Sequence, residues 1–307
     1  MRRVRYTRGG GPEVLFTEEV AVPEPGPGEL LVRAEAIGVT LPVVRKVREA
    51  RDPIPLGGEV AGRVVALGAG VTACAVGDRV TGLVLGHGYA DHVLLHVTMA
   101  SPVPDGASAV DAVALVRSGL VAYGALRAAR PESGESALVT AAASGVGQLA
   151  VQLARLNGAS RVTAAVSDRR KADFVRALGA DSVVTYGEES WGEPVDYVLD
   201  AVGGDLLTPA VAALAPYGRL VAYSSGGGTV SAYDLLVGAR SVIGFQMALI
   251  ARERPGTYEA WRRELWELFL TGALTPCVHG EFALEDAADA HAVIEGRANL
   301  GKVVLIP

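Results

Sequence analysis

The sequence predicts an α/β protein that combines a helix-flanked parallel sheet with a second domain rich in short strands. Two observations support this class. Residues 1 to about 115 contain short Val-rich runs broken by Gly and Pro, which is typical of an antiparallel barrel or sandwich. From about residue 111, helical periods alternate with compact apolar strands, as in βαβ units. The length of 307 residues favours two domains, each able to bury its own core.

The expected elements follow from these patterns. In the first part, the strand candidates are residues 30–34, 62–67 and 89–94. In the second part, strands are expected at 137–141, 162–166, 182–185, 197–202, 220–223 and 242–245. This is the strand number of a complete dinucleotide-binding, doubly wound sheet of the Rossmann type. An amphipathic helix follows, with an apolar face formed by Trp261, Leu265, Leu268 and Phe269. A last strand at 302–306 is expected to return to the first domain.

Composition excludes several classes of protein. Half of the residues are apolar and 20% are charged, as in soluble globular proteins, and no uninterrupted apolar run reaches the roughly 18 residues that span a membrane. The formal charge of −6 argues against non-specific nucleic-acid binding. No signal-peptide stretch follows Met1, so a cytoplasmic protein is expected. Cys74 and Cys277 indicate neither a metal site nor a disulfide framework, so redox chemistry would need a bound cofactor.

The most informative motif is a turn between a strand and a helix. Residues 137–141 form a buried-strand run, and the small residues after it let backbone amides approach a pyrophosphate closely. The following apolar positions form the stripe of a helix that faces a sheet, and a helix N-terminus favours negative charge. A hydrolase nucleophile elbow is the rival interpretation, but that motif needs glycine where Ala142 and Val146 stand. We therefore assign cofactor binding to Ala142, Ser144, Gly145, Val146 and Gly147.

The residues after the second strand bear on the choice of cofactor. An acid there would hold the ribose 2′-hydroxyl of NADH, and a basic cluster would hold the 2′-phosphate of NADPH. The chain has Ser167-Asp168-Arg169-Arg170-Lys171. Three cations against one carboxylate favour NADPH, with Arg170 and Lys171 among the ligands. Asp168 leaves NADH open, and a solvated helix start is the alternative for the two arginines.

Further segments occur in a characteristic order along the whole chain. They are Gly10-Gly11-Pro12-Glu13-Val14-Leu15, Gly57-Gly58-Glu59-Val60-Ala61-Gly62, Gly77-Asp78-Arg79-Val80, Gly119-Leu120-Val121-Ala122-Tyr123 and Leu178-Gly179-Ala180-Asp181. With these segments the chain resembles the medium-chain dehydrogenase/reductase superfamily, specifically its zinc-free quinone oxidoreductase and enoyl reductase branch. The order and spacing of the segments together make this resemblance specific.

The resemblance implies the domain organisation and the cofactor contacts. It implies a GroES-like β-barrel catalytic domain, made of residues 1–118 and 250–307, and a Rossmann NADPH-binding domain at 119–249. It places the 2′-phosphate on Ser167, Lys171 and Tyr186, which are all suitable donors. The other cofactor contacts that it implies are Val202, Ser224, Ser225, Phe245 and Asn299. It also suggests a homodimer formed through the outer Rossmann strand at 242–245.

Zinc can be assessed from residue types. Zinc alcohol dehydrogenases use Cys and His ligands, but their Gly-His-Glu segment corresponds to Gly57-Gly58-Glu59 here, and Val39 and Thr40 stand at the Cys position. His92 and His96 share a strand face without an acid or Cys nearby, so surface or core histidines are the better interpretation, as for His87. No metal site is expected.

The resemblance implies direct hydride transfer from NADPH to a carbon conjugated to a carbonyl, as in quinones, enones or enoyl thioesters. The proton donor of the family is not carried over, because Leu41 and Val43 cannot replace a phenol or a carboxylate. Val121 stands where relatives often have threonine, and Thr40 is the remaining candidate donor near nicotinamide or substrate. The leading function is a quinone or activated-alkene reductase. A trans-acting enoyl reductase of a polyketide-type pathway and a low-turnover NADPH-binding sensor are the alternatives.

A basic segment lies next to this gap. It reads Arg45-Lys46-Val47-Arg48-Glu49-Ala50-Arg51. We hypothesise that it holds an anionic handle of the small-molecule substrate, such as a phosphopantetheine or a carboxylate. The alternative is a solvated helix face.

Overall fold

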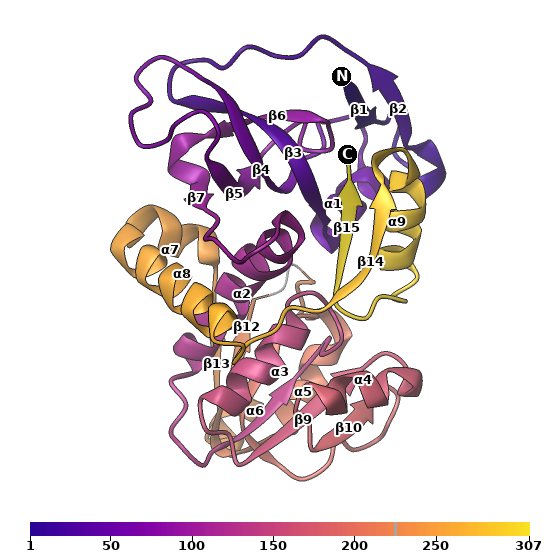
Figure 1. Cartoon of the computed structure of the whole chain (residues 1–307). Coiled ribbons are helices and arrows are strands. Elements are labelled where there is room, and N and C mark those ends of the chain that lie inside the picture. Colours follow the sequence, from indigo (N-terminus) through magenta and orange to yellow (C-terminus); the bar gives the residue numbers. More distant parts are fainter. Residues whose placement is uncertain (224–225) are drawn as a thin grey trace. The chain divides into compact units, whose positions relative to one another are not determined.

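The computed structural model describes residues 1–223 and 226–307, which form two compact units. Unit 1 consists of Met1–Arg117 and Val278–Pro307, and unit 2 consists of Ser118–Cys277. Figure 1 shows this in its colours, because the yellow C-terminal strands lie beside the indigo and purple strands of the N-terminal part. The return of the last strand to the first domain is thus observed.

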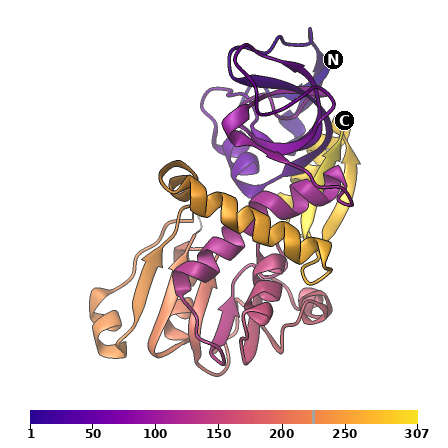
Figure 2. The same cartoon turned by 60° about the vertical axis from the view of Figure 1, so that its left-hand side comes forward.

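One boundary differs from the expected one. Residues 250–277 belong to unit 2, not to the barrel. The reason is that α8 (Pro255–Leu270) packs on α2 (Ala109–Ala129), which it crosses in Figure 2. The Tyr123 hydroxyl of α2 donates a hydrogen bond to Glu264 of α8, and the Tyr123 ring meets Trp261 edge to face at 5.9 Å. The apolar face of α8 therefore has its partner inside unit 2.

Unit 2 contains a six-stranded parallel sheet in the order β10-β9-β8-β11-β12-β13. All six strands expected from the sequence are present. They are β8 (Ser136–Val139), β9 (Arg161–Val166), β10 (Ser182–Thr185), β11 (Val195–Asp200), β12 (Leu214–Ala222) and β13 (Ser241–Gly244). Numbered along the domain, this is the order 3-2-1-4-5-6 of a dinucleotide-binding sheet. The order in which successive strands are added to the sheet reverses between β8 and β11, and ligands of such sheets bind at that switch point.

Helices cover both faces of this sheet (Figure 2). Right-handed connections place the helices before and after the reversal on opposite faces. They are α3 (Gly147–Leu156), α4 (Ala172–Ala177), α5 (Leu207–Ala212) and α6 (Ala232–Gly238), followed by α7 (Met247–Glu253) before α8. The stripe predicted for α3 is buried, since Leu149, Ala150 and Leu153 are at most 2% exposed. Burial of these apolar side chains fixes α3, and with it the turn that precedes it.

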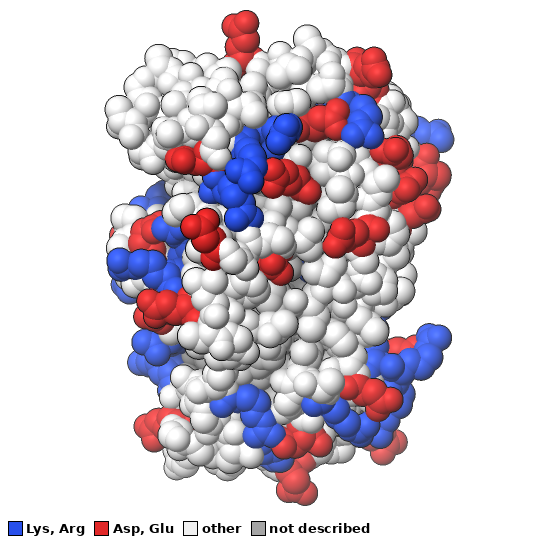
Figure 3. All heavy atoms as spheres, viewed as in Figure 1, with Lys and Arg blue, Asp and Glu red and all other residues white. Residues whose placement is uncertain are grey.

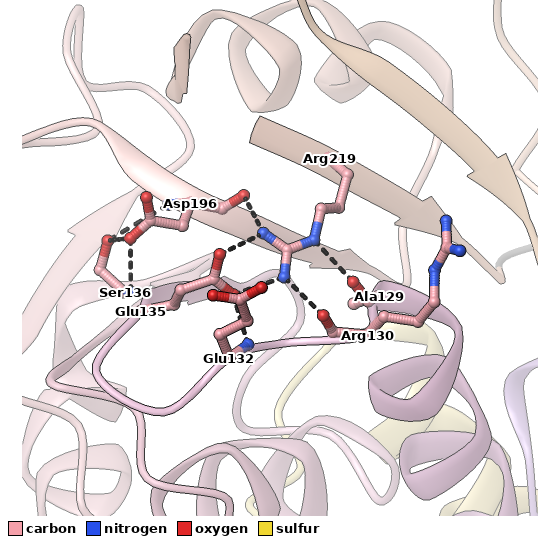
Figure 4. A network of polar contacts seen from close by, with 7 residues as sticks. All are labelled: Ala129, Arg130, Glu132, Glu135, Ser136, Asp196 and Arg219. Atoms are coloured by element: carbon pink, nitrogen blue, oxygen red, sulfur yellow. Dashed lines mark hydrogen bonds and ion pairs between the residues drawn. The ribbon is translucent and has the colours of Figure 1, made fainter. Parts of the chain in front are cut away.

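A network of hydrogen bonds around Arg219 lies at one edge of the sheet, near the start of β8 and β11 (Figure 4). Arg219 of β12 donates to both carboxylate oxygens of Glu135, which precedes β8. Its remaining N–H groups donate to the backbone carbonyls of Ala129, Arg130 and Asp196. All five donors of this guanidinium are thus used. The network ties the end of α2 to three neighbouring strands.

Unit 1 is the barrel-type domain expected from the first part of the sequence. Its main sheet has the order β14-β15-β3-β4-β5-β7, with β6 also paired to β3 and a separate β1-β2 pair. The strands are β1 (Arg2–Arg5), β2 (Phe16–Glu19), β3 (Glu29–Val39), β4 (Gly58–Leu67), β5 (Arg79–Val84), β6 (His92–His96), β7 (Ala100–Pro102), β14 (Val278–Ala283) and β15 (Lys302–Ile306). Two helices, α1 (Leu41–Glu49) and α9 (Ala287–Glu295), complete the unit. Its core includes Leu30, Ile37, Val60, Tyr89 and Val303.

The long helix α2 is apolar enough in composition and length to cross a membrane. Two thirds of that stretch, 67%, is buried inside the structure. Ala114, Leu115 and Ala125 are among its fully buried residues. The helix is therefore explained as a core helix.

Candidate cofactor and active site

The turn after β8, which was assigned to the cofactor, is tight and closely packed. Ala141 adopts a left-handed conformation with φ of +47°, which is uncommon for a residue with a side chain. A Cβ added to Gly147 would lie 2.1 Å from the carbonyl oxygen of Ala141, so only glycine fits there. Ala142 is fully buried, and its N–H donates to the carbonyl of Ala165 on β9. The turn is thus held close to the N-terminus of α3.

Ser144 organises the start of α3. Its Oγ accepts a hydrogen bond from the Gly147 N–H at 3.0 Å, and its carbonyl accepts one from the Gln148 N–H. Gly145 and Val146 lie between these residues and are half-buried. The N-terminus of this ten-residue helix carries a partial positive charge, which suits a phosphate group.

Tyr186 reaches this turn from the end of β10. Its hydroxyl accepts a hydrogen bond from the Ala141 N–H at 2.9 Å. The half-buried Lys171 ends a 3-10 turn, Arg169–Lys171, which begins shortly after β9, and the exposed Ser167 directly follows β9. Parallel neighbours β9 and β10 end at the same edge of the sheet. The three residues assigned to a 2′-phosphate therefore project from that one edge.

Arg170 and Asp168 form an ion pair in the same segment. The Arg170 Nη2 lies 2.6 Å from Asp168 Oδ2, and its Nε donates to the same carboxylate. These hydrogen bonds lower the pKa of Asp168 to about 2. The side chain of Arg170 is 90% exposed. The one acid that would favour NADH is thus already engaged by a neighbouring arginine.

A buried polar cluster lies behind the turn, at the end of β11. Asp200 is fully buried, and its Oδ1 accepts hydrogen bonds from the Thr140 hydroxyl at 2.7 Å and from the Val202 N–H. Its Oδ2 accepts one from the Gly203 N–H. These contacts fix the backbone after β11, where Val202 was assigned to the cofactor. Thr140 was missed by the sequence analysis, and no sequence signal distinguishes it from a core residue.

Tyr223 adds an unused donor at the end of β12. Its hydroxyl is buried and has no hydrogen-bond partner among the described residues. Burial and the nearby Asp200 carboxylate raise the pKa of Tyr223 well above its ordinary value, so the phenol stays protonated. The next two residues, Ser224 and Ser225, lie outside the described residues. Phe245, also assigned to the cofactor, lies against Gly124 of α2.

Unit 1 holds the other assigned residues. Thr40 follows β3 and precedes α1, and it is half-buried. Its hydroxyl makes no capping hydrogen bond to α1. The Asn299 side chain is buried and donates to the Gly301 carbonyl at 2.9 Å. Asn299 thus shapes the turn before β15, and a direct contact with cofactor remains a prediction.

An ion triad that sequence reasoning missed lies beside Gly38 at the end of β3. Glu59 of β4 accepts hydrogen bonds from Lys302 of β15 and from Arg117 of α2, the latter at 2.8 Å. The side chains of Glu59 and Lys302 are only 4% and 3% exposed. Burial would raise the pKa of Glu59, but the two cations outweigh it and lower that pKa, and burial lowers the pKa of Lys302. A Cβ on Gly38 would lie 2.7 Å from the Lys302 side chain, so glycine makes room for it.

The basic segment forms α1 and the residues after it. Val43, Val44 and Val47 are buried, which leaves the cations toward the outside of the helix. Arg48 forms an ion pair with Glu295 of α9 at 3.1 Å. Among the described residues, no three His, Cys, Asp or Glu side chains gather in a way that could hold a metal ion.

The fold and the turn define a dinucleotide-dependent oxidoreductase with a separate barrel domain. Residues 26–105 match the alcohol dehydrogenase GroES-like domain family, and residues 145–267 match the zinc-binding dehydrogenase family. A quinone oxidoreductase of Pseudomonas aeruginosa is 33% identical, covering 100% of this chain and 99% of its own. A 2-haloacrylate reductase of a Burkholderia species is 30% identical, covering 97% of this chain and 96% of its own.

Among solved structures, a mycobacterial protein in complex with NADPH superposes with a TM-score of 0.92 at 32% identity, covering 100% of both chains. The chain therefore belongs to the quinone oxidoreductase branch of the medium-chain dehydrogenase/reductase superfamily. This confirms the resemblance and the fold class that the sequence predicted.

Proposed function

We propose that the chain is an NADPH-dependent oxidoreductase that reduces a quinone or an activated alkene without a metal ion. The observation that carries this proposal is the turn at Ala141–Gly147, with Tyr186 and Lys171 at the neighbouring strand ends. The relatives named quinone oxidoreductase and 2-haloacrylate reductase support the two substrate classes. Zinc is not required in this proposal. Thr40 and Gly58 stand at the positions where zinc alcohol dehydrogenases have their Cys and His ligands.

The residues of unit 2 fit the cofactor in three parts. The amides of Gly145 and Val146 would hold the pyrophosphate at the N-terminus of α3. Lys171, Ser167 and Tyr186 would hold the 2′-phosphate, and Arg170 would add positive charge beside it. The Tyr223 hydroxyl, which has no hydrogen-bond partner among the described residues, is a further donor for a polar group of the cofactor, since a buried donor without a partner is costly.

When bound, NADPH supplies a hydride for an electrophilic carbon. The chain then has to bind and orient the substrate and to stabilise the oxygen that gains negative charge. Thr40 is the candidate donor, because its hydroxyl is not used to cap α1. Leu41 and Val43 bring no proton, so solvent is the proton source in this proposal.

The test follows NADPH absorbance with a quinone panel and with a panel of enones and 2-haloacrylates. Oxidation in either panel supports the enzyme. Tight NADPH binding with silence in both would instead support a low-turnover sensor. The variant Lys171→Met should raise the KM for NADPH about 10- to 100-fold and leave the KM for NADH unchanged, because a charge-assisted hydrogen bond is lost. Arg176→Met is the matched control, since Arg176 pairs with Asp173 and is not assigned to the cofactor.

The basic helix α1 refines the substrate class. We assign Arg45 and Arg48 to an anionic substrate handle, which would suit a carboxylate or a phosphopantetheine of a trans-acting enoyl reductase. Arg45→Gln with Arg48→Gln should raise the KM for an acidic alkene and leave that for a neutral quinone unchanged. Lys46→Gln is the control on the same helix. Equal effects on both substrates would remove this assignment.

A second copy of the chain is the proposed protein partner. Strand β13 ends the sheet of unit 2, and strand edges offer unpaired backbone groups for pairing. Beside it α6 has no buried residue, and Tyr233, Leu236 and Val237 are 71%, 75% and 68% exposed. Such apolar exposure is typical of an interface. Leu236→Glu should convert a dimer to a monomer in light scattering; a wild-type chain that is monomeric at all concentrations would refute the proposal.

A further inference from the structure

Tyr186 contacts the turn at 141–147 as well as forming part of the edge assigned to the 2′-phosphate. It directly follows β10, and its hydroxyl oxygen accepts a hydrogen bond from the Ala141 N–H at 2.9 Å. Its own backbone N–H donates to the carbonyl of Val166, the last residue of β9, at 3.2 Å. A phenol can accept one hydrogen bond and donate another. The same oxygen can therefore support the turn and donate to a phosphate.

Ala141 is the residue on which this turn closes. Its φ of +47° is a left-handed conformation that residues with a side chain rarely adopt. Its carbonyl accepts a hydrogen bond from the Ser144 N–H at 2.8 Å and lies against Gly147. Its N–H donates to the Tyr186 hydroxyl. Removing that hydroxyl would take away the acceptor of this N–H, and a backbone conformation of this kind persists only when its surroundings hold it.

The positive charge at this edge comes from residues other than Tyr186. Figure 3 shows basic side chains gathered over the part of unit 2 that contains α4, and the segment Arg169–Lys171 directly precedes this helix. The attraction of a 2′-phosphate to the edge therefore does not depend on Tyr186, which contributes no positive charge. What Tyr186 adds is a fixed oxygen that links this edge to the turn.

Trp191 holds the Tyr186 ring in place. The two ring centroids are 6.0 Å apart and the ring planes are inclined by 39°, which lies in the range of stabilising aromatic pairs. Trp191 is 4% exposed and packs in a core cluster with Val184 and Leu207. Its indole N–H is buried and has no hydrogen-bond partner among the described residues. A buried donor without a partner is costly, so Trp191 contributes through the packing of its ring.

We propose that Tyr186 couples the 2′-phosphate edge to the pyrophosphate turn, and that Trp191 is a positioning residue for Tyr186. This inference rests on the proposed NADPH site. Its consequence differs from that of a ligand of the 2′-phosphate alone. Loss of Lys171 weakens only NADPH, whereas loss of the Tyr186 hydroxyl also weakens NADH, because both cofactors place a pyrophosphate on the turn. Loss of the Trp191 ring has the same direction of effect, because it acts through Tyr186.

The first test measures the Kd of NADPH and of NADH for the full-length protein by isothermal titration calorimetry, which needs no turnover. Weak NADH binding is measured by displacement of NADPH. Tyr186→Phe should raise the Kd of NADH about 3- to 10-fold and that of NADPH at least as much, because one hydrogen bond to the turn is lost. Tyr197→Phe is the matched control. Tyr197 of β11 is also buried, and its hydroxyl has no partner among the described residues, so both Kd values should stay unchanged.

The second test separates the positioning role of Trp191 from a contribution to stability alone. Trp191→Leu should raise both Kd values about 3- to 5-fold, and Trp191→Phe, which keeps an aromatic ring, should restore most of the binding. Trp266→Leu is the control, because Trp266 of α8 is also buried, packs edge to face on Phe269 and has an indole N–H without a partner in the described part of the chain. Both leucine variants should lower the Tm, and only Trp191→Leu should change the Kd values.

The outcomes distinguish this inference from the proposed function. Weaker binding of both cofactors in Tyr186→Phe and Trp191→Leu, with both controls unchanged, supports the coupling. If Tyr186→Phe weakens NADPH and leaves NADH unchanged, the coupling is refuted while the proposed NADPH site stands. A lower Tm with unchanged Kd values in Trp191→Leu, or an equal change in Trp266→Leu, removes the role of Trp191. A wild-type protein that binds neither nucleotide overturns the proposed function as well.

Discussion

Replacing Glu59 with glutamine should destabilise the protein more than replacing either of its cationic partners. The carboxylate is 4% exposed and is the only side-chain partner that the described residues offer to Lys302, whose side chain is 3% exposed. Without the negative charge, Lys302 is a buried charge with no counter-charge, and breaking a buried pair in this way costs about 3–5 kcal/mol. For a domain the size of unit 1 that corresponds to a Tm lower by roughly 6–20 °C.

The partner variants set the scale for this prediction. Lys302→Met leaves Glu59 paired with Arg117 and should cost about 1–2 kcal/mol. Arg117 is 41% exposed, so Arg117→Met should cost about 1 kcal/mol or less after screening by solvent. Urea unfolding followed by circular dichroism at neutral pH measures all three. If Glu59→Gln lowers the free energy of unfolding no more than Arg117→Met does, the Glu59 carboxylate is not the group that balances the buried charge of Lys302.

The same variant has a signature in pH. The pKa of Glu59 is lowered in the folded protein, so its stabilisation is present above the ordinary carboxyl pKa and is lost as pH falls through the folded value. Glu59→Gln should therefore flatten the acid side of the stability curve. An acid side unchanged from that of the wild type would contradict this reasoning.

Three further predictions concern His291, Gly147 and Arg219. His291 is 1% exposed, and burial lowers its pKa to about 4. As pH falls, this histidine is protonated in the unfolded chain before it is protonated in the folded protein, so the free energy of unfolding should fall from pH 6.5 toward pH 4. His291→Phe should reduce this pH dependence in urea unfolding experiments. Gly147→Ala should weaken NADPH binding at least about tenfold in fluorescence titrations, because its Cβ would meet the Ala141 carbonyl; an unchanged Kd would refute the tight turn. Arg219→Met should cost about 3 kcal/mol by calorimetry, since Glu135 loses its bidentate partner, and a loss below about 1 kcal/mol would contradict the network.

The sheet of unit 2 could be predicted from the sequence because its signal is local. Compact apolar runs and the i, i+3, i+4 stripe of α3 are read from adjacent residues, and all six strands were found. The partner of α8 could not be predicted in this way. Its amphipathic pattern shows that one face is buried but not against what, and that face packs on α2.

In the candidate site, too, the parts with a local sequence signal could be predicted and the parts that depend on distant residues could not. The turn at 141–147 carries its geometry in its own residue types. The triad does not, because Glu59 and Lys302 are 243 positions apart and only the pairing of β3 with β4 and β15 brings them together. Arg170 shows a third limit: its positive charge could be counted in the basic cluster from the sequence, but its hydrogen bonds to Asp168 depend on the side-chain conformation.

Unit 1 consists of two segments that flank unit 2 in the sequence, and this has a consequence for folding during translation. Strand β15 lies between β14 and β3, yet it is synthesised after the whole of unit 2. Domains generally fold as units during translation, so the continuous unit 2 can be complete while the barrel still lacks an inner strand. The exposed edge of β3 is then a transient site for mispairing. A chain that stops between unit 2 and β15 would thus join a complete nucleotide-binding domain to a barrel with an open, aggregation-prone strand edge.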